Sequence, residues 1–318
     1  MKIGIFAGSA PILGEIKQDL YKVLEDLGIE VFEHPQCKLN YNGYLAGTVE
    51  QRVTAIHELF LDKTVDVIMA FWGGQNTNEI LPLLNYELID KNIKPIIGYS
   101  DTTCLLLALY AKTHCPTFIG CAGISFTKPE PISYTIDRFK EIFIDKKKLI
   151  IIKDSDQYAD DYYFLKKNPL NQIREKKNNE GRKVFRHGIA RGVAIGANIQ
   201  TLLLLAGTKF FPNLDNTILF LEEAEECSSP AVLHRFLTHL SQVVDFNKIA
   251  GICFGRFTAH SNIKNEEQLR QIINDVFGNF TMPILFNLDF GHSDPSFIVP
   301  NGSKCLLDTR KNIIQFKL

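Results

Sequence analysis

The sequence has almost no net charge, a single tryptophan and no apolar run long enough to cross a membrane. Its 35 basic and 36 acidic side chains give a formal net charge of −1, which offers no general attraction to nucleic acid or to an anionic membrane. A bilayer needs ~18–20 apolar residues, and the apolar stretch in the N-terminal MKIGIFAGSAP is also too short for a signal peptide. We therefore expect a cytoplasmic protein whose ligand is a small molecule or a peptide.

Paired cysteines and metal motifs are also missing. The seven cysteines are scattered without a CxxC pair, and several lie inside apolar runs, as Cys104 and Cys253 do. Such cysteines are typical of buried thiols in a reducing compartment. The cysteines and histidines lack the spacing of metal ligands, and no GxxxxGK[ST] or GxGxxG motif follows a strand. We expect neither a metal nor a cofactor, and these two kinds of nucleotide-binding loop are unsupported.

What the first part of the chain does contain is an alternation of short apolar runs with helical patterns. A length of 318 residues favours two domains. Thr48 and Gln51 form a capping-box pattern ahead of a helix. Apolar strands separated by helices indicate a parallel sheet covered on both faces, with ligands at the carboxyl ends of the strands. The expected strands are 2–6, 30–34, 65–72 and 94–99, and the expected helices are 15–28, one starting after 48, and 101–111.

The rest of the chain predicts a linker and a second domain. Residues 151–186 are polar, charged and aromatic with little periodicity, which is typical of a linker or a long functional loop. Ser229 and Pro230 mark a helix start. We expect domains at 1–150 and 187–318, the second mixed and rich in strand. Its expected elements are a strand and helix within 192–207, strands at 217–223, 248–257 and 282–291, helices at 228–244 and 265–278, and a hairpin at 305–316.

Ser100 is expected at a strand-to-helix turn, a position at which nucleophilic serines occur. In IIGYSDTT an apolar strand runs into Gly98 and Tyr99, and a helix is expected from Asp101. Such a turn presents the hydroxyl at the carboxyl end of the strand and points the first helical N–H groups at a developing oxyanion. Thr102 replaces the last glycine of GxSxG, so an α/β-hydrolase elbow is a poor match. On this segment alone, the alternative is that Ser100 caps the helix.

A serine nucleophile needs a base, and among the eight histidines His292 is the candidate. It follows an apolar strand in FGHSDPSFIVPNG, within a loop fixed by glycine and proline. A lone loop histidine is still more often a hydrogen-bonded structural residue. His34 and His114 lie beside turns without acidic neighbours in the sequence, and we do not assign them a catalytic role.

The acid that orients the histidine is expected at the end of the strand TILFLEE. Strand alternation places Glu222 and Glu223 on opposite faces, and a carboxylate ending a buried strand needs a partner. Glu222 leaves the strand first and is the candidate. For Glu223, Glu225 and Glu226 we favour a solvated acidic cluster.

Gly73 and Gly74 follow another apolar strand, in AFWGGQNTNE. Adjacent glycines let the backbone come close to a ligand and can turn N–H groups toward it. A phosphate loop is the rival interpretation.

Together these segments resemble the LD-carboxypeptidase family of serine peptidases, and within it the microcin C self-immunity branch. The resemblance covers nearly the whole chain: the glycine pair, IGYSD around Ser100, GANIQTLLLLAGT from Gly196, ILFLEE, and FGHSDP around His292, in that order. It implies an N-terminal flavodoxin- or Rossmann-like layer, a swivelling β-rich α/β C-terminal domain, and a homodimer.

The resemblance also implies roles for the candidate residues. Ser100 matches the nucleophile, Glu222 the acid and His292 the general base. The oxyanion hole would use backbone N–H groups of Gly73 or Gly74 and of Asp101.

For the substrate, the resemblance favours the self-immunity branch, because GGQNTNE follows the branch where murein enzymes usually have Tyr and Gly after the glycine pair. Asn198 matches an asparagine that contacts the nucleotide part of the ligand. The only tryptophan is Trp72, so Tyr158, Tyr162 or Tyr163 would have to stack on the base. The predicted substrate is a peptidyl- or aminoacyl-adenylate. The alternatives are a murein tetrapeptide that loses its terminal D-alanine, and a non-catalytic protein that binds a peptide or nucleotide.

Overall fold

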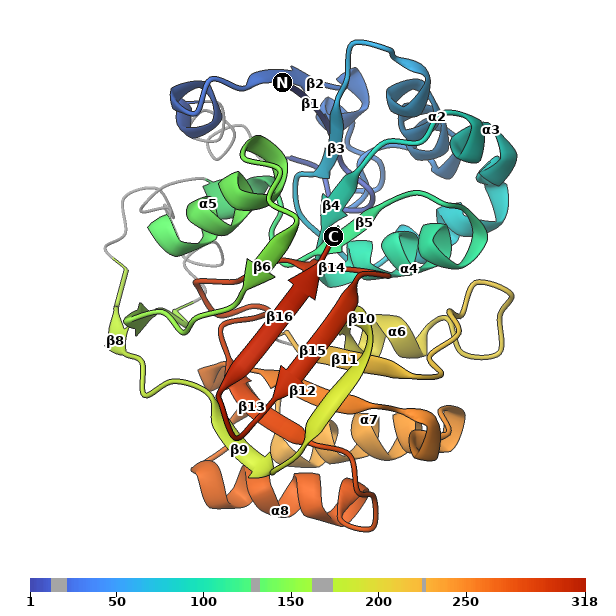
Figure 1. Cartoon of the computed structure of the whole chain (residues 1–318). Coiled ribbons are helices and arrows are strands. Elements are labelled where there is room, and N and C mark those ends of the chain that lie inside the picture. Colours follow the sequence, from blue (N-terminus) through green and yellow to red (C-terminus); the bar gives the residue numbers. More distant parts are fainter. Residues whose placement is uncertain (13–21, 127–131, 162–173, 225–226) are drawn as a thin grey trace.

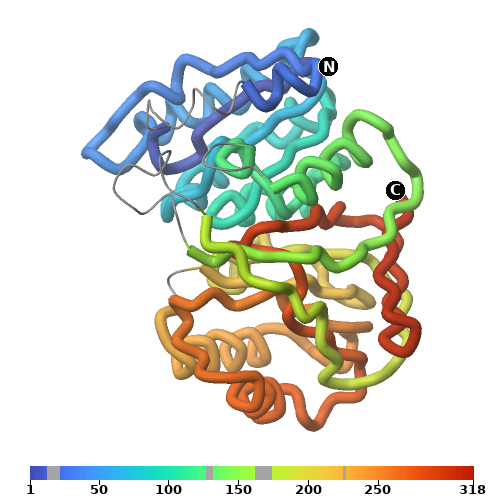
Figure 2. The backbone as a smooth tube through the Cα atoms, turned by 90° about the vertical axis from the view of Figure 1, so that its left-hand side faces the viewer, coloured from blue at the N-terminus to red at the C-terminus, as the bar shows by residue number. Residues whose placement is uncertain are grey.

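The computed structural model describes residues 1–12, 22–126, 132–161, 174–224 and 227–318. Figure 1 shows an N-terminal unit above a C-terminal unit, and Figure 2 shows the same two layers from the side. This is the α/β fold with a parallel first sheet and a strand-rich second part that the sequence predicts. Part of the expected helix 15–28 lies outside the described residues, as do Tyr162, Tyr163, Glu225 and Glu226.

The first sheet has six strands in the order β14-β5-β4-β3-β1-β2. Its five N-terminal strands are parallel, and their order, 2-1-3-4-5, is that of flavodoxin-like folds. Figure 1 shows α2, α3 and α4 on one side of this sheet and α5 on the other. The elements are β1 (Lys2–Phe6), β2 (Glu30–Glu33), α2 (Val49–Leu61), β3 (Val67–Ala70), α3 (Tyr86–Lys91), β4 (Ile96–Gly98), α4 (Thr103–Lys112), β5 (Thr117–Ile119) and α5 (Ser133–Phe139).

The second sheet has eight strands in the order β6-β16-β15-β10-β11-β12-β13-β9. Strands β10 to β13 are parallel, and the expected C-terminal hairpin is the antiparallel pair β15 and β16. Figure 1 shows α7 and α8 together in the lower part of this unit. The elements are β6 (Leu149–Ile151), β9 (Lys183–Arg186), β10 (Ile189–Asn198), α6 (Ile199–Leu203), β11 (Thr217–Glu222), α7 (Pro230–Val243), β12 (Gly251–Gly255), α8 (Glu266–Phe277), β13 (Ile284–Leu288), β15 (Lys304–Asp308) and β16 (Ile313–Lys317).

Several local predictions are confirmed. Thr48 and Gln51 form both hydrogen bonds of the capping box at α2, and the side chain of Ser229 accepts from Val232 N at the start of α7, where Pro230 is the first helical residue. All seven cysteines are buried, and no disulfide joins them. No helix among the described residues is long and apolar enough to span a membrane.

Two strands join the units, and the sequence pattern did not indicate either of them. β6, from the N-terminal part, pairs with β16 of the second sheet. β14 (Val299–Pro300), from the C-terminal part, pairs antiparallel with β5 of the first sheet. Gly196 of β10 lies against Val299 and Ile119, so the two sheets share one apolar core at this crossing.

Because the chain before β14 passes close to Gly120, we expect that this glycine cannot be replaced by a residue with a side chain. A Cβ on Gly120 would lie 2.1 Å from the carbonyl oxygen of Phe297, and its φ is +150°. We expect Gly120→Ala to lower the free energy of unfolding by about 2–4 kcal/mol, because the two backbones would have to separate. The matched control is Gly207→Ala, at φ +77° with nothing within 4 Å, which should cost only the ~1–2 kcal/mol of the left-handed backbone. Denaturant unfolding compares them, and equal losses would contradict the crossing.

Candidate functional site

Ser100 sits in a strained turn directly after β4. Its φ is +59°, and it is the first residue of a 3-10 turn, Ser100–Thr102, that runs into α4. A left-handed backbone is unfavourable for a residue with a Cβ, and nucleophilic serines on strand-to-helix turns adopt this kind of conformation. The cap positions belong to Tyr99 for the 3-10 turn and Thr102 for α4. The alternative in which Ser100 is the helix cap therefore does not describe this turn.

The glycine pair meets this turn from the neighbouring strand. A Cβ on Gly73 would lie 2.8 Å from both Cβ and Oγ of Ser100 and 3.1 Å from the backbone nitrogen of Asp101. Gly74, with φ +139°, approaches Ser9 instead, whose Oγ would lie 2.4 Å from its Cβ. Gly73 thus packs against the serine, and Gly74 packs against the loop after β1.

Asp101 ties the two loops together through its side chain. Its Oδ2 accepts hydrogen bonds from the backbone N–H of Thr77, at 2.9 Å, and from Thr77 Oγ1, at 2.6 Å. Burial raises the pKa of the Asp101 carboxyl, and the hydrogen bonds that it accepts from Thr77 oppose this rise. The Asp101 carboxylate therefore has a structural role. The backbone nitrogen of Asp101 lies beside the point where Gly73 approaches Ser100.

His292 and Glu222 form a buried hydrogen-bonded pair. His292 Nδ1 lies 2.6 Å from Glu222 Oε2, and their side chains are 5% and 1% exposed. Two glycines make room for the Glu222 side chain. A Cβ on Gly291, at φ +105°, would lie 2.7 Å from Glu222 Oε2, and one on Gly255 would lie 3.2 Å from Glu222 Cβ and 2.1 Å from the carbonyl oxygen of Phe290. With Nδ1 engaged by the acid, Nε2 is the ring nitrogen that can exchange a proton with a substrate or nucleophile.

Tyr99 connects the two halves of the candidate site. Its ring centroid lies 5.0 Å from that of His292, with the planes tilted by 55°. Tyr99 directly precedes Ser100 in the chain. The turn that contains Ser100, at the end of a strand of the first sheet, therefore lies next to the Glu222–His292 pair of the second unit.

Asn198 lies beside the acid but already has a structural role. It is paired with Glu222 in the parallel register of β10 and β11. It is the N-cap of α6, and its Oδ1 accepts from the backbone N–H and the hydroxyl of Thr201, both at 3.0 Å. Its Oδ1 is therefore engaged within the chain.

Tyr158, in β7 (Gln157–Tyr158), lines a cavity of about 410 Å³ at the carboxyl ends of β12 and β13. The guanidinium of Arg256 lies over its ring at 4.1 Å from the centroid. Arg256 directly follows Gly255, which packs against Glu222, so the cavity begins next to the acid.

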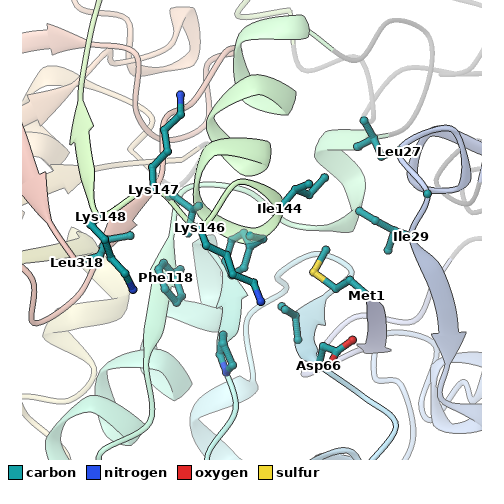
Figure 3. Close-up of a pocket in the computed structure, with 15 residues that line it drawn as sticks. Met1, Leu27, Ile29, Asp66, Phe118, Ile144, Lys146, Lys147, Lys148 and Leu318 are labelled. Carbon is teal, nitrogen blue, oxygen red and sulfur yellow. The ribbon is translucent and has the colours of Figure 1, made fainter.

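A larger cavity, of about 670 Å³, lies away from these residues (Figure 3). Met1, Asp66, Pro95 and Phe118 are among the residues that line it. Met1 precedes β1, Asp66 precedes β3 and Pro95 precedes β4, so this cavity is at the amino ends of the strands. Ser100 and the glycine pair follow the carboxyl ends, where ligands of such sheets bind.

One expectation about the other candidates was wrong, and two further histidines have acidic partners that their flanking sequence does not contain. Glu223 is buried, and its Oε1 accepts from the backbone N–H of Gln200 at 2.7 Å, so it is not part of a solvated cluster. His34 lies 2.8 Å from Glu58, and His114 lies 3.0 Å from Asp90. Both acids are 24 residues away in the chain, which is why the flanking sequence did not reveal them. Among the described residues, no three His, Cys, Asp or Glu side chains gather as a metal ion would require.

Comparison with known protein families finds matches in both units. Residues 3–120 match the model of the LD-carboxypeptidase N-terminal domain, and residues 191–307 match that of the C-terminal domain.

Relatives named as carboxypeptidases and a relative named as a self-immunity protein align over most of the chain. A putative carboxypeptidase of Treponema pallidum is 34% identical over 86% of this chain and 79% of its own length. The microcin C7 self-immunity protein MccF of Escherichia coli is 31% identical over 98% and 92%. A probable murein peptide carboxypeptidase of Bacillus subtilis is 28% identical over 96% and 88%.

Solved structures agree with the whole fold. An MccF-like protein from Bacillus anthracis superposes with a TM-score of 0.93 at 30% identity, covering 99% of this chain and 96% of the other. MccF in complex with aspartyl sulfamoyl adenosine gives 0.90 at 27% identity, covering 100% and 96%. An MccF-like protein from Streptococcus pneumoniae in complex with AMP gives 0.87 at 25% identity, covering 99% and 98%.

The Thr77–Asp101 contact gives a stability prediction. Thr77→Val keeps the shape of the buried side chain but removes one donor to the carboxylate, which should cost about 1–3 kcal/mol. Because that donor favours the ionised carboxyl, its loss raises the Asp101 pKa further. The cost should therefore be largest above the folded-state pKa and shrink as the pH falls through it.

Unfolding at pH 4 and at pH 8 measures this difference. The control is Thr64→Val, which removes the hydroxyl of an exposed Thr–Asp contact with Asp62 and should cost less than ~1 kcal/mol. A Thr77→Val cost that is the same at both pH values would contradict the assigned contact.

Proposed function

The chain belongs to the LD-carboxypeptidase family, and we propose that it cleaves an amide bond through a Ser100–Glu222–His292 triad and an acyl-enzyme. Membership makes it a serine carboxypeptidase-type hydrolase. The observation that supports the triad most directly is the buried 2.6 Å hydrogen bond between His292 and Glu222, with the imidazole against Tyr99, the residue before Ser100.

In the proposed reaction His292 Nε2 takes the proton from Ser100 Oγ as the oxygen attacks the substrate carbonyl carbon. The tetrahedral intermediate collapses when the imidazolium returns that proton to the leaving nitrogen, and the acyl group stays on the serine. A water molecule, deprotonated by His292, then cleaves the ester and releases the carboxylic acid. Glu222 keeps Nδ1 protonated and stabilises the imidazolium that forms in each step.

The oxyanion of the tetrahedral intermediate needs N–H donors near Ser100. We assign this role to the backbone of the glycine pair, Gly73 and Gly74, and to that of Asp101. The close approach of Gly73 to Ser100 and to Asp101 N supports the assignment, because donors fixed in place before the reaction stabilise developing charge without reorganisation.

For the substrate we propose a peptidyl- or aminoacyl-adenylate in which an amide nitrogen joins the acyl group to the nucleotide, so that the acyl group passes to Ser100 and the protonated nitrogen leaves with the nucleotide. MccF has been solved with aspartyl sulfamoyl adenosine and an MccF-like protein with AMP. In this chain the amide NH2 of Asn198 and the ring of Tyr158 are the groups that we assign to the nucleotide. Tyr162, the other candidate, lies outside the described residues.

A murein tetrapeptide is the second candidate substrate, because a probable murein peptide carboxypeptidase also aligns over most of the chain. The same triad would then release the terminal D-alanine. The homodimer implied by the resemblance stays a prediction.

Ser100→Ala tests whether the protein is a catalyst of this kind. We expect kcat/KM to fall by at least ~10³-fold, as for other serine nucleophiles, while a non-hydrolysable aminoacyl-sulfamoyl adenosine still binds. Wild-type protein is incubated with an amide-linked aminoacyl-AMP and with murein tetrapeptide, and product masses identify the bond that is cut. The control is Ser241→Ala in α7. Turnover within a few fold of wild type in Ser100→Ala would assign the reaction to another nucleophile, and a wild-type protein that binds both substrates without cleaving either would support the binding-protein alternative.

The pH profile tests His292 and Glu222 together. We expect kcat/KM to fall on acidification, since a protonated imidazole cannot accept the serine proton; an unperturbed histidine titrates near ~6.5. Glu222→Gln retains an acceptor for Nδ1–H but removes the charge that stabilises the imidazolium. Its rate should drop by orders of magnitude, and its acidic limb should move to lower pH. A wild-type rate that stays flat down to about pH 5, or an acidic limb that Glu222→Gln leaves in place, would rule out this base.

A further inference from the structure

The segment that holds His292, residues 289–296, is bound on two sides by the linker between the units. Asp294, two residues after His292, exchanges backbone hydrogen bonds with Ala159 of the linker: Ala159 N donates to Asp294 O at 2.7 Å, and Asp294 N donates to Ala159 O at 2.8 Å. The linker therefore pairs directly with the backbone beside the proposed general base.

Arg174 adds a charged contact at the same point. Its guanidinium donates from one nitrogen to Asp294 Oδ2, at 2.9 Å, and from Nε to Asp161 Oδ1, at 2.7 Å. The side chains of Arg174 and Asp161 are only 4% and 5% exposed. Such a guanidinium bridges two carboxylates with fixed geometry, which a lysine cannot do.

A second contact holds the other end of the segment. Asp289 is buried and accepts from the backbone N–H of Ser155 at 2.7 Å, from Asn179 Nδ2 at 3.1 Å, and from Arg256 at 2.8 Å. Arg256 also reaches Ser293 Oγ at 3.3 Å. Asp289 and Asp294, which lie on either side of His292, are thus both bonded to linker residues.

These contacts matter for catalysis because a general base must be held within a few tenths of an ångström of its productive position. The Glu222 bond fixes one nitrogen of the ring. The position of the ring also follows the backbone from residue 291 to residue 294. Contacts on Asp294 restrict movement of this backbone directly.

We propose that Arg174 is a positioning residue, which holds the backbone at His292 through Asp294 and so couples the linker to the general base. The inference rests on the proposed function, because it takes His292 as the base. Arg174 acts only through Asp294 and its backbone. It affects how often the imidazole is aligned with Ser100, and therefore kcat, more than substrate affinity.

The test compares Arg174→Ala, Arg174→Lys and a matched control. The control is Arg182→Ala, which removes another buried Arg–Asp pair of the same linker, with Asp154 at 2.6 Å. The described hydrogen bonds of the Arg182 side chain go to Asp154 and Ile152, outside the His292 segment. The assay uses whichever substrate, amide-linked aminoacyl-AMP or murein tetrapeptide, the wild-type protein hydrolyses.

We expect Arg174→Ala to lower kcat by about 10–100-fold, as for a misplacement of roughly 1 Å, with KM changed by less than ~3-fold. Arg174→Lys should recover part of the loss. Arg182→Ala should lower the melting temperature to a similar extent while kcat stays within ~3-fold of wild type.

Three outcomes would overturn the positioning inference or the proposed function. If Ser100→Ala is inactive but Arg174→Ala keeps kcat within the range of Arg182→Ala at a similar melting temperature, the positioning inference is wrong and the proposed function stands. If Ser100→Ala turns over substrate like wild type, the proposed function itself fails. An Arg174→Ala effect on KM alone would assign Arg174 to substrate binding and would also contradict the inference.

Discussion

The hydrogen bond between His292 and Glu222 is the interaction on which the rest of the site depends. It joins the end of β11 to the loop after β13, and both partners are almost completely buried. A charge taken out of water in this way is costly unless it is paired, and removing one partner of such a pair typically costs about 3–5 kcal/mol. Gly291 is required beside it because a side chain there would press on the carboxylate, and Gly255 because a side chain there would press on the Phe290 carbonyl and the stem of Glu222. The proposed triad acid therefore lies at the carboxyl end of β11.

In the other half of the site, the residue with the strained backbone is the proposed nucleophile, Ser100. Ser100 adopts a left-handed backbone at the end of β4, and the surrounding contacts keep it there: Gly73 packs on its side chain, and Asp101 anchors the turn to Thr77. Strain of this kind persists only when the neighbourhood over-determines the conformation. The crossing of β14 into the first sheet then holds this half against the half with His292.

The sequence predicted the features that depend on local patterns, and it missed those that depend on distant partners. The capping box at Thr48 and the parallel strands could be read because their signals lie within a few residues. β6 and β14 are short strands whose partners belong to the other unit, so no local pattern marks them. Glu223 was assigned to solvent because its partner, Gln200, comes from α6. The Arg174–Asp294 contact spans 120 residues and has no signature in the sequence.

Covalent labelling of the serine tests the central claim most directly. Wild-type protein is treated with a fluorophosphonate, residual hydrolysis is followed over time, and the adduct is located by peptide mass spectrometry. We expect one adduct per chain, on the peptide with Ser100, with activity lost in proportion to labelling and slower labelling in His292→Ala. An adduct on another residue, full activity in the labelled protein, or no adduct in a protein that hydrolyses its substrate would contradict it.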